Sequence, residues 1–359
     1  MKHSPFADDI GVLPSLSSQS SCIPYTLWSL FANASADLIM RSVSRLLRSP
    51  SRKIIWFGYT FFLIFFLLNT AVAEARLYYD KPRNVKPLTA DISLPMNRIS
   101  SKHYCVDVYI NHRGPFKFLV DTGASLSVIS QELANKLNLE TVKRVKFSRN
   151  NSQFRGNLYR IPSLRLGSAE IYDYDMMVYP EPTFISYLKE GFHEHIDGIL
   201  GIGAFYEYLL TLDFQHSVLR LENRHLTSNA NTSTFDNSEK IPIVVVVFKD
   251  DKNHVKEMNF VVDSGSNEEF TLPPGIVALP FTKMRSQSIQ NGSHYGEQTA
   301  AKEKIAANAY WGRKEFKEPN VVYNKTLYDT NVSFGLMGIL VMEHLKITID
   351  QRKRLIQIE

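Results

Sequence analysis

The sequence predicts a mostly β-stranded protein made of two similar lobes. Two stretches carry this expectation, because each runs from an apolar segment straight into a polar turn that begins with Asp: Phe118–Ile129, which reads FLVDTGASLSVI, and Phe260–Leu272, which reads FVVDSGSNEEFTL. An apolar run before such a turn indicates a buried strand that presents the acid on a rigid support. The chain therefore carries two copies of one acid-bearing loop, with Asp121 in the first and Asp263 in the second.

The segments that follow the two loops also correspond. Gly201 ends the sequence GILG and lies 80 residues after Asp121, while Gly338 ends GLMG and lies 75 residues after Asp263. Twelve residues beyond each of these glycines stands a further Asp, in LTLDF and in ITIDQ. An internal duplication explains these parallels, since one repeated unit places all of its motifs twice.

Length and composition fit two globular domains. The chain has 359 residues, of which 44% are hydrophobic and 21% charged, so it can bury sizeable cores. The formal net charge is only +5, and much of the basic excess precedes the first lobe, so we expect no nucleic-acid function. Cys22 precedes the hydrophobic segment, which leaves Cys105 as the single thiol of a mature exported form and excludes an internal disulfide there. A buried apolar role is expected for Cys105.

Residues 54–73 carry no charge over a length that can cross a membrane. Five basic residues precede them, which predicts that the N-terminus stays in the cytoplasm and both lobes are exported. Ala71-Val72-Ala73 also matches a signal-peptidase site, so a retained transmembrane anchor and a cleaved signal both remain open. In either case we expect a periplasmic or other extracytoplasmic location.

The remaining boundaries follow composition. Strand-like pairs that end at the two acids are expected at 104–110 with 116–120, and at 241–248 with 258–262. The predicted order is a disordered basic region at 1–53, the export segment at 54–73, a tether at 74–91, a first lobe at 92–224, a polar linker at 225–240 and a second lobe at 241–359.

These paired motifs resemble the aspartic protease superfamily over about residues 92–359, with retropepsin-sized lobes joined on one chain as in bilobal pepsin-like enzymes. The low cysteine content favours bacterial members. The resemblance implies an all-β acid-protease fold with few short helices, two β-barrel lobes related by pseudo-twofold symmetry, and an active site between them. It also implies an extended peptide substrate, no cofactor, and a monomer, because both catalytic loops lie on one chain.

The resemblance also assigns residue roles. Asp121 and Asp263 would form the catalytic pair, supported by the hydroxyl and glycine neighbours in their loops, and the apolar-apolar-Gly segments would pack behind those loops. A polar hairpin in the first lobe would be the flap that closes over substrate. The residues implied are Thr122, Gly123, Ser264 and Gly265 as supports, Gly201 and Gly338 as structural glycines, and Phe154, Arg155 and Gly156 as flap-tip candidates.

Two carboxyls that share one proton can hydrolyse a peptide without metal or covalent intermediate. The ionised carboxyl takes a proton from a bound water while the protonated one donates to the carbonyl oxygen. The pair titrates as a unit, so neither acid has a fixed role. Ser266 follows the second triplet where Ala124 follows the first, and a hydroxyl there can stabilise an ionised carboxylate. We therefore expect an optimum between strongly acidic and neutral pH.

Two alternatives remain open. Glu268 and Glu269 stand where the first lobe has Leu126 and Ser127, and we expect these acids to point to solvent. If instead they mark a second lobe relaxed from catalysis, the chain would be a catalytically silent peptide-binding module.

A metal hydrolase using His193, His195 and Asp197 is the third interpretation, since imidazoles at that spacing can meet one ion. A polar loop that enters the Asp197-Gly198 turn explains these residues better, and we expect no metal.

Overall fold

The structure is a computed structural model in which residues 82–359 form one compact unit. It describes residues 84–149, 152–178, 194–272, 283–293, 296–323 and 334–359. These are mostly strand, with the short helices α3 (Gln131–Lys136), η2 (Ile202–Phe205) and α5 (Ile339–Met342). Within these ranges no helix is long and apolar enough to cross a membrane. The regions predicted at 1–53 and 54–73, and most of the tether, lie outside them.

The first lobe is a nine-stranded sheet whose order is β1-β9-β6-β10-β5-β4-β8-β7, with β3 paired to β4. The predicted hairpin at 104–120 is confirmed as β4 and β5, and its second strand ends at Asp121. The strands are β1 (Asn84–Val85), β3 (Asn97–Arg98), β4 (Tyr104–Ile110), β5 (Arg113–Asp121), β6 (Val128–Ile129), β7 (Glu140–Arg149), β8 (Ser152–Leu166), β9 (Ala169–Val178) and β10 (Gly198–Gly201).

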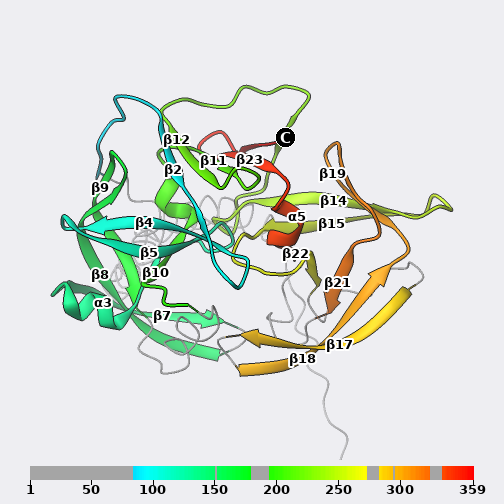
Figure 1. Ribbon diagram of the computed structural model, residues 1–359, viewed down its shortest axis with the longest axis horizontal. Helices are drawn as coiled ribbons and strands as arrows, with labels where there is room; N and C mark the ends of the chain where they lie inside the picture. The colour runs from blue at the N-terminus through cyan, green and yellow to red at the C-terminus, as the bar shows by residue number, and fades with distance from the viewer. Residues whose placement is uncertain (1–83, 150–151, 179–193, 273–282, 294–295, 324–333) are drawn as a thin grey trace, which may run out of the picture. The chain divides into compact units, whose positions relative to one another are not determined.

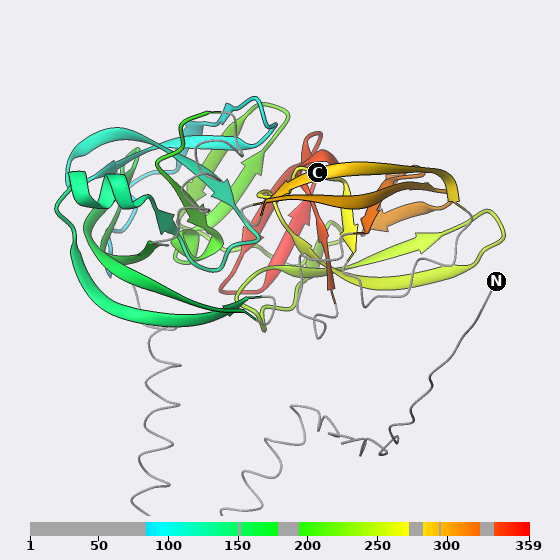
Figure 2. The same cartoon turned by 90° about the horizontal axis from the view of Figure 1, so that it is seen from below.

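The second lobe repeats this plan in a sheet of nine described strands, ordered β17-β18-β21-β16-β22-β15-β14-β19-β20. Its long hairpin β17–β18, in gold, corresponds to the green hairpin β7–β8 (Figure 2). The strands are β14 (Ile243–Lys249), β15 (Val255–Val262), β16 (Phe270–Leu272), β17 (Lys283–Ser293), β18 (Gly296–Ile305), β19 (Asn308–Trp311), β20 (Lys314–Phe316), β21 (Asn320–Tyr323) and β22 (Phe334–Met337).

The spacing between the repeated motifs of the sequence is explained by the register of two parallel strand pairs. In the first lobe β10 lies beside β5, with Gly201 opposite Asp121. In the second, β22 lies beside β15, with Met337 opposite Val262, so that Gly338 and Asp263 follow as the next pair. Residues that are 80 and 75 positions apart in the sequence are therefore neighbours on adjacent strands. This repeated pairing confirms the predicted two-lobe fold class.

A third sheet takes strands from both halves of the chain. Its order is β13-β24-β23-β11-β12-β2, and β11 (green) pairs with β23 (red) where the two halves meet (Figure 1). Both of these strands are almost wholly buried, because the two lobes cover them. The strands are β2 (Ile92–Pro95), β11 (Leu209–Asp213), β12 (Val218–Glu222), β13 (Thr232–Thr234), β23 (Lys346–Asp350) and β24 (Leu355–Ile358).

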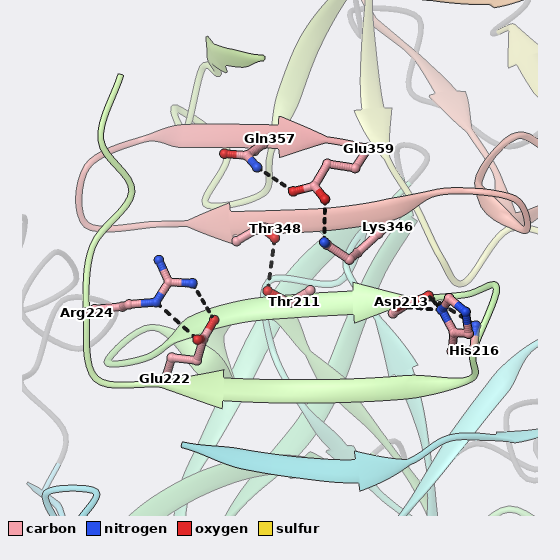
Figure 3. A network of polar contacts seen from close by, with 9 residues as sticks. All are labelled: Thr211, Asp213, His216, Glu222, Arg224, Lys346, Thr348, Gln357 and Glu359. Carbon is pink, nitrogen blue, oxygen red and sulfur yellow. Dashed lines mark hydrogen bonds and ion pairs between the residues drawn. The ribbon is translucent and has the colours of Figure 1, made fainter. Parts of the chain in front are cut away.

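The pseudo-twofold axis passes between Thr211 and Thr348. These residues occupy equivalent positions of the two repeats, two residues before the aspartates of LTLD and ITID, and they lie opposite each other in the β11–β23 pair. Their buried hydroxyl oxygens are 2.9 Å apart (Figure 3). A residue that pairs with its own repeat copy must lie on the symmetry axis.

Two segments are more ordered than the sequence suggested. The predicted linker contributes β13, an edge strand on β24, and the side chains of Leu226 and Phe235, which lie on either side of β13, are buried. The C-terminal part of the predicted tether forms β1, which pairs with β9. Both strands are short edge additions of two or three residues, so their local sequence carries too few apolar positions to show a strand period.

A substitution on the axis tests whether the buried threonine pair joins the two halves. Thr211→Val keeps the side-chain shape but leaves the Thr348 hydroxyl without this partner. We expect the free energy of unfolding of the full chain to fall by about 1–3 kcal/mol, measured by urea denaturation. The double variant Thr211→Val/Thr348→Val should recover most of the loss, because no hydroxyl is then left behind. An unchanged stability in the single variant contradicts the assignment.

Candidate active site

Two buried strands carry the candidate acids. Asp121 is the last residue of β5, and the three residues before it are almost completely buried. Asp263 follows β15 directly, and its backbone N–H donates to the carbonyl of Met337 on β22 (2.9 Å). Because these strands pack in the interior of the sheet, they fix the backbone positions of Asp121 and Asp263. The sequence analysis expected such a rigid support for each acid.

Four hydrogen bonds lock the two loops together. The backbone N–H of Thr122 donates to Ser264 Oγ (3.0 Å), and the N–H of Ser264 donates to Thr122 Oγ1 (3.0 Å). Each hydroxyl then donates onward to a strand of the other lobe: Thr122 Oγ1 to the Val262 carbonyl (2.5 Å) and Ser264 Oγ to the Val120 carbonyl (2.8 Å). Both hydroxyl residues are buried, so water does not compete for these bonds.

Each carboxyl lies against the glycine of the opposite loop. A methyl group built on Gly123 would lie 2.5 Å from Oδ1 of Asp263, and one built on Gly265 would lie 2.5 Å from Cγ of Asp121. No side chain fits at such a distance, so glycine is required at both places. The contacts also bring the side chains of Asp121 and Asp263 into one site across the lobe boundary.

Backbone N–H groups orient both carboxyls. Gly123 and Ala124 donate to Oδ1 of Asp121 (2.9 and 3.1 Å), and Gly265 donates to Oδ1 of Asp263 (2.9 Å). Backbone donors favour the ionised form of a carboxyl. The turn that follows each acid therefore both aims the side chain and stabilises negative charge on it.

The structural glycines pack behind the loops. A methyl group on Gly201 would lie 2.6 Å from the Ala124 carbonyl oxygen, and one on Gly338 would lie 2.7 Å from the Ser266 carbonyl oxygen. The residue after each glycine donates its N–H to that same carbonyl, at 2.9 Å in the first lobe and 2.8 Å in the second. The repeated apolar-apolar-Gly segment thus supports the loop from below.

The sequence analysis expected the two extra acids of the second loop, Glu268 and Glu269, to point to solvent, and this expectation was wrong. Glu268 is partly buried and pairs with the ammonium group of Lys302 on β18 (2.6 Å). Glu269 accepts hydrogen bonds from the backbone (2.9 Å) and the side-chain amide of Asn320 on β21. Both acids therefore bind the loop to its own lobe.

The hairpin β7–β8 is the predicted flap, and residues 150–151, between its two strands, lie outside the described ranges. The flap-tip candidates Phe154, Arg155 and Gly156 lie on β8 instead, opposite Phe147, Lys146 and Val145. They were placed too far along the chain, because the polar run that suggested the tip continues into the strand. The side chains of Phe154 and Arg155 are outside what the structure describes, and Gly156 is buried.

The candidate metal ligands have structural partners. Asp197 accepts a hydrogen bond from the Lys117 backbone N–H (2.8 Å) through one carboxylate oxygen, and His195 Nε2 lies 3.0 Å from the other. His193 lies outside the described residues. In the described part of the chain, no three His, Cys, Asp or Glu side chains come together as a metal site.

Cys105 is fully buried on β4, and burial raises the pKa of its thiol to about 12. It therefore stays a neutral thiol, in keeping with an apolar packing role.

One residue near the acids was missed by the sequence analysis. His103 is buried, and its Nε2 lies 3.0 Å from the carbonyl oxygen of Gly265 in the second loop. The only feature of the sequence that could have indicated His103 was its place as a polar residue directly before a predicted strand.

Comparison with known protein families finds one match. A family model described as aspartyl protease matches residues 106–204, a segment that contains Asp121, Gly201 and most of the first lobe. No curated protein matches the chain.

Two solved structures illustrate its structural likeness. The aspartic proteinase from Irpex lacteus is 13% identical, with a TM-score of 0.46, and the match covers 75% of this chain and 97% of that one. A retropepsin-like aspartic protease from Rickettsia conorii is 20% identical, with a TM-score of 0.27 and coverage of 39% and 93%. The match over residues 106–204, which holds the first acid-bearing loop, makes this part of the chain similar to the aspartyl protease family.

Proposed function

We propose that this chain is an aspartic endopeptidase in which Asp121 and Asp263 jointly activate a water molecule against a peptide bond. The observation that carries the proposal is the reciprocal placement of the two loops, in which each carboxyl lies against the glycine of the other loop. The match of residues 106–204 to the aspartyl protease family supports peptide or protein as the substrate class. Because one chain supplies both loops, a monomer is sufficient.

The mechanism follows from the proximity of the two acids. Carboxyls held this close do not both ionise readily, so the pair retains one proton near working pH, as is general for aspartic proteases. The ionised carboxyl accepts a proton from the water as its oxygen attacks the carbonyl carbon. The protonated carboxyl donates to the carbonyl oxygen as it becomes a hydroxyl. Collapse of this tetrahedral intermediate breaks the C–N bond: the nitrogen leaves with a proton from the pair, and a hydroxyl of the intermediate returns its proton to the pair as the carbonyl forms again, so the pair ends with one shared proton.

The surrounding hydrogen bonds support this chemistry. The Thr122–Ser264 bonds hold the loops in one arrangement, so the carboxyls need little reorganisation during the reaction. Lys302 and Asn320 engage Glu268 and Glu269, so these acids are directed to their own lobe. That pairing removes the main reason to regard the second lobe as relaxed from catalysis, and it favours the enzyme over the silent peptide-binding module.

Export also remains part of the proposal. It rests on the uncharged segment at 54–73 and the basic residues before it, and it is compatible with either an anchored or a released enzyme.

Replacing either acid distinguishes an enzyme from a binding module. Asp121→Asn and Asp263→Asn should each reduce hydrolysis of an unbiased peptide mixture to background, because the pair needs one ionised carboxyl and one proton. The full chain is assayed between pH 3 and pH 8, with and without a statine-type inhibitor that mimics the tetrahedral intermediate. No cleavage by the unmodified chain at any of these pH values, with peptide binding retained in both variants, would establish the binding module.

The Thr122 hydroxyl offers a second test. Thr122→Val removes the donor to the Val262 carbonyl and the acceptor for the buried Ser264 N–H, so we expect a loss of about 1–3 kcal/mol in stability and a lower kcat. Thr122→Ser keeps the hydroxyl and serves as the matched control. Urea denaturation and initial rates measure the two effects. Equal behaviour of the valine and serine variants refutes a role for the hydroxyl.

The pH profile reports on the shared proton. We expect a bell-shaped dependence of kcat on pH with its maximum between strongly acidic and neutral values, because both fully protonated and fully ionised pairs are inactive. Ser266→Ala makes the second loop match the first, which has Ala124, and should move the maximum to higher pH by removing a hydroxyl that can stabilise the carboxylate. A maximum above neutrality in the unmodified chain contradicts the mechanism.

A further inference from the structure

His103 reaches from the first lobe to the second catalytic loop. It stands directly before β4 and is only 4% exposed. Its backbone carbonyl accepts the N–H of Ile99 (2.9 Å), which fixes the main chain at this point. Its ring nitrogen Nε2 lies 3.0 Å from the carbonyl oxygen of Gly265. A carbonyl oxygen only accepts hydrogen bonds, so Nε2 is the donor.

The other side of the ring is also bonded. Nδ1 lies 2.9 Å from the hydroxyl of Ser101. With the hydrogen on Nε2, the neutral ring accepts from this hydroxyl at Nδ1 and is fully satisfied. Burial lowers the pKa of His103 from its usual value, which favours this neutral form.

Gly265 links this histidine to both acids. Its N–H donates to Oδ1 of Asp263, and its Cα faces the carboxyl of Asp121 so closely that a methyl group would lie 2.5 Å from Cγ. The N–H and the carbonyl of this one glycine are thus both held by hydrogen bonds. A shift of this residue would change the orientation of Asp263 and its contact with Asp121 together.

The internal repeat indicates that the fold does not need a histidine here. Cys105 lies opposite Leu119 in the β4–β5 hairpin, so continuing the register by two residues brings His103 opposite Asp121. In the second lobe Ile243 lies opposite Val261, and the same step brings Ile241 opposite Asp263. An isoleucine has no hydrogen-bonding side chain, yet the second hairpin forms with it. The bond from His103 to Gly265 therefore has no counterpart at the equivalent position of the second lobe, Ile241.

We propose that His103 is a positioning residue for catalysis, which holds the Gly265 peptide group so that Asp263 stays aligned with Asp121. This inference rests on the proposed protease function and adds to it a residue outside the two acid-bearing loops. His103 itself does not exchange protons with substrate. It acts through Gly265 on the geometry of the pair.

Two substitutions separate the hydrogen bond from simple packing. His103→Leu fills space but cannot donate, so kcat should fall about tenfold, the equivalent of one buried hydrogen bond, with little change in KM. His103→Gln keeps an N–H donor and should recover most of kcat. His216→Gln, at an exposed histidine bonded to Asp213, is the matched control and should behave as the unmodified chain. All variants are measured as the full chain.

Amide hydrogen exchange provides a readout that does not need activity. We expect faster exchange of the amides at 264–268 in His103→Leu than in the unmodified chain, and near-normal exchange in His103→Gln. Equal loss of kcat in the leucine and glutamine variants, or unchanged kcat and exchange in the leucine variant, overturns the proposal. If the unmodified chain hydrolyses nothing, the protease function falls, while the exchange rates still decide whether His103 restrains the loop.

Discussion

The reciprocal hydrogen bonds of Thr122 and Ser264 are the interaction on which the rest of the site depends. Each hydroxyl accepts the N–H of the other residue and donates to a carbonyl of the opposite strand. All of these groups are buried, so breaking one bond leaves a polar atom without water to replace it. The loops therefore cannot slide past each other at low cost, and the positions of the two acids follow from this single arrangement.

A second pair of hydroxyls fixes the same axis from another sheet. Thr211 and Thr348 meet between β11 and β23, whereas Thr122 and Ser264 meet between the ends of β5 and β15. Two contacts at different places on one axis restrict rotation as well as separation of the lobes. The largest apolar cluster supports this, because it includes residues of both lobes, among them Phe118, Phe205, Phe248 and Phe260.

Much of this could be predicted from the sequence because the duplication repeats its signals. The spacing from Asp121 to Gly201 and from Asp263 to Gly338 anticipated the strand register, since a parallel neighbour must return to the same level of the sheet. The hairpin strands could likewise be predicted, because they contain strong apolar runs. The prediction of Asp121 and Asp263 as candidate site residues was made from the same repeat.

Contacts between distant polar residues could not be predicted in this way. Glu268 was expected to face solvent, because nothing in its neighbourhood indicates that Lys302 will lie beside it. His103 and Gly265 are 162 residues apart, and neither belongs to a periodic pattern that could reveal the other. Apolar periodicity reports which face of a strand is buried, but it carries no information about which polar groups meet across the lobes.

The mixed sheet has a consequence for how the protein is made. Strand β11 from the first half finds its neighbour β23 only after 346–350 have been synthesised, and β13 must wait for β24. The first half can leave the ribosome with its own sheet formed, but one edge stays open and its acid stays unmatched. Such long-range closure is slow and exposes strand edges during biogenesis. The proposed activity needs an acid from each half, so it can arise only once the second half of the chain has been made and has folded onto the first.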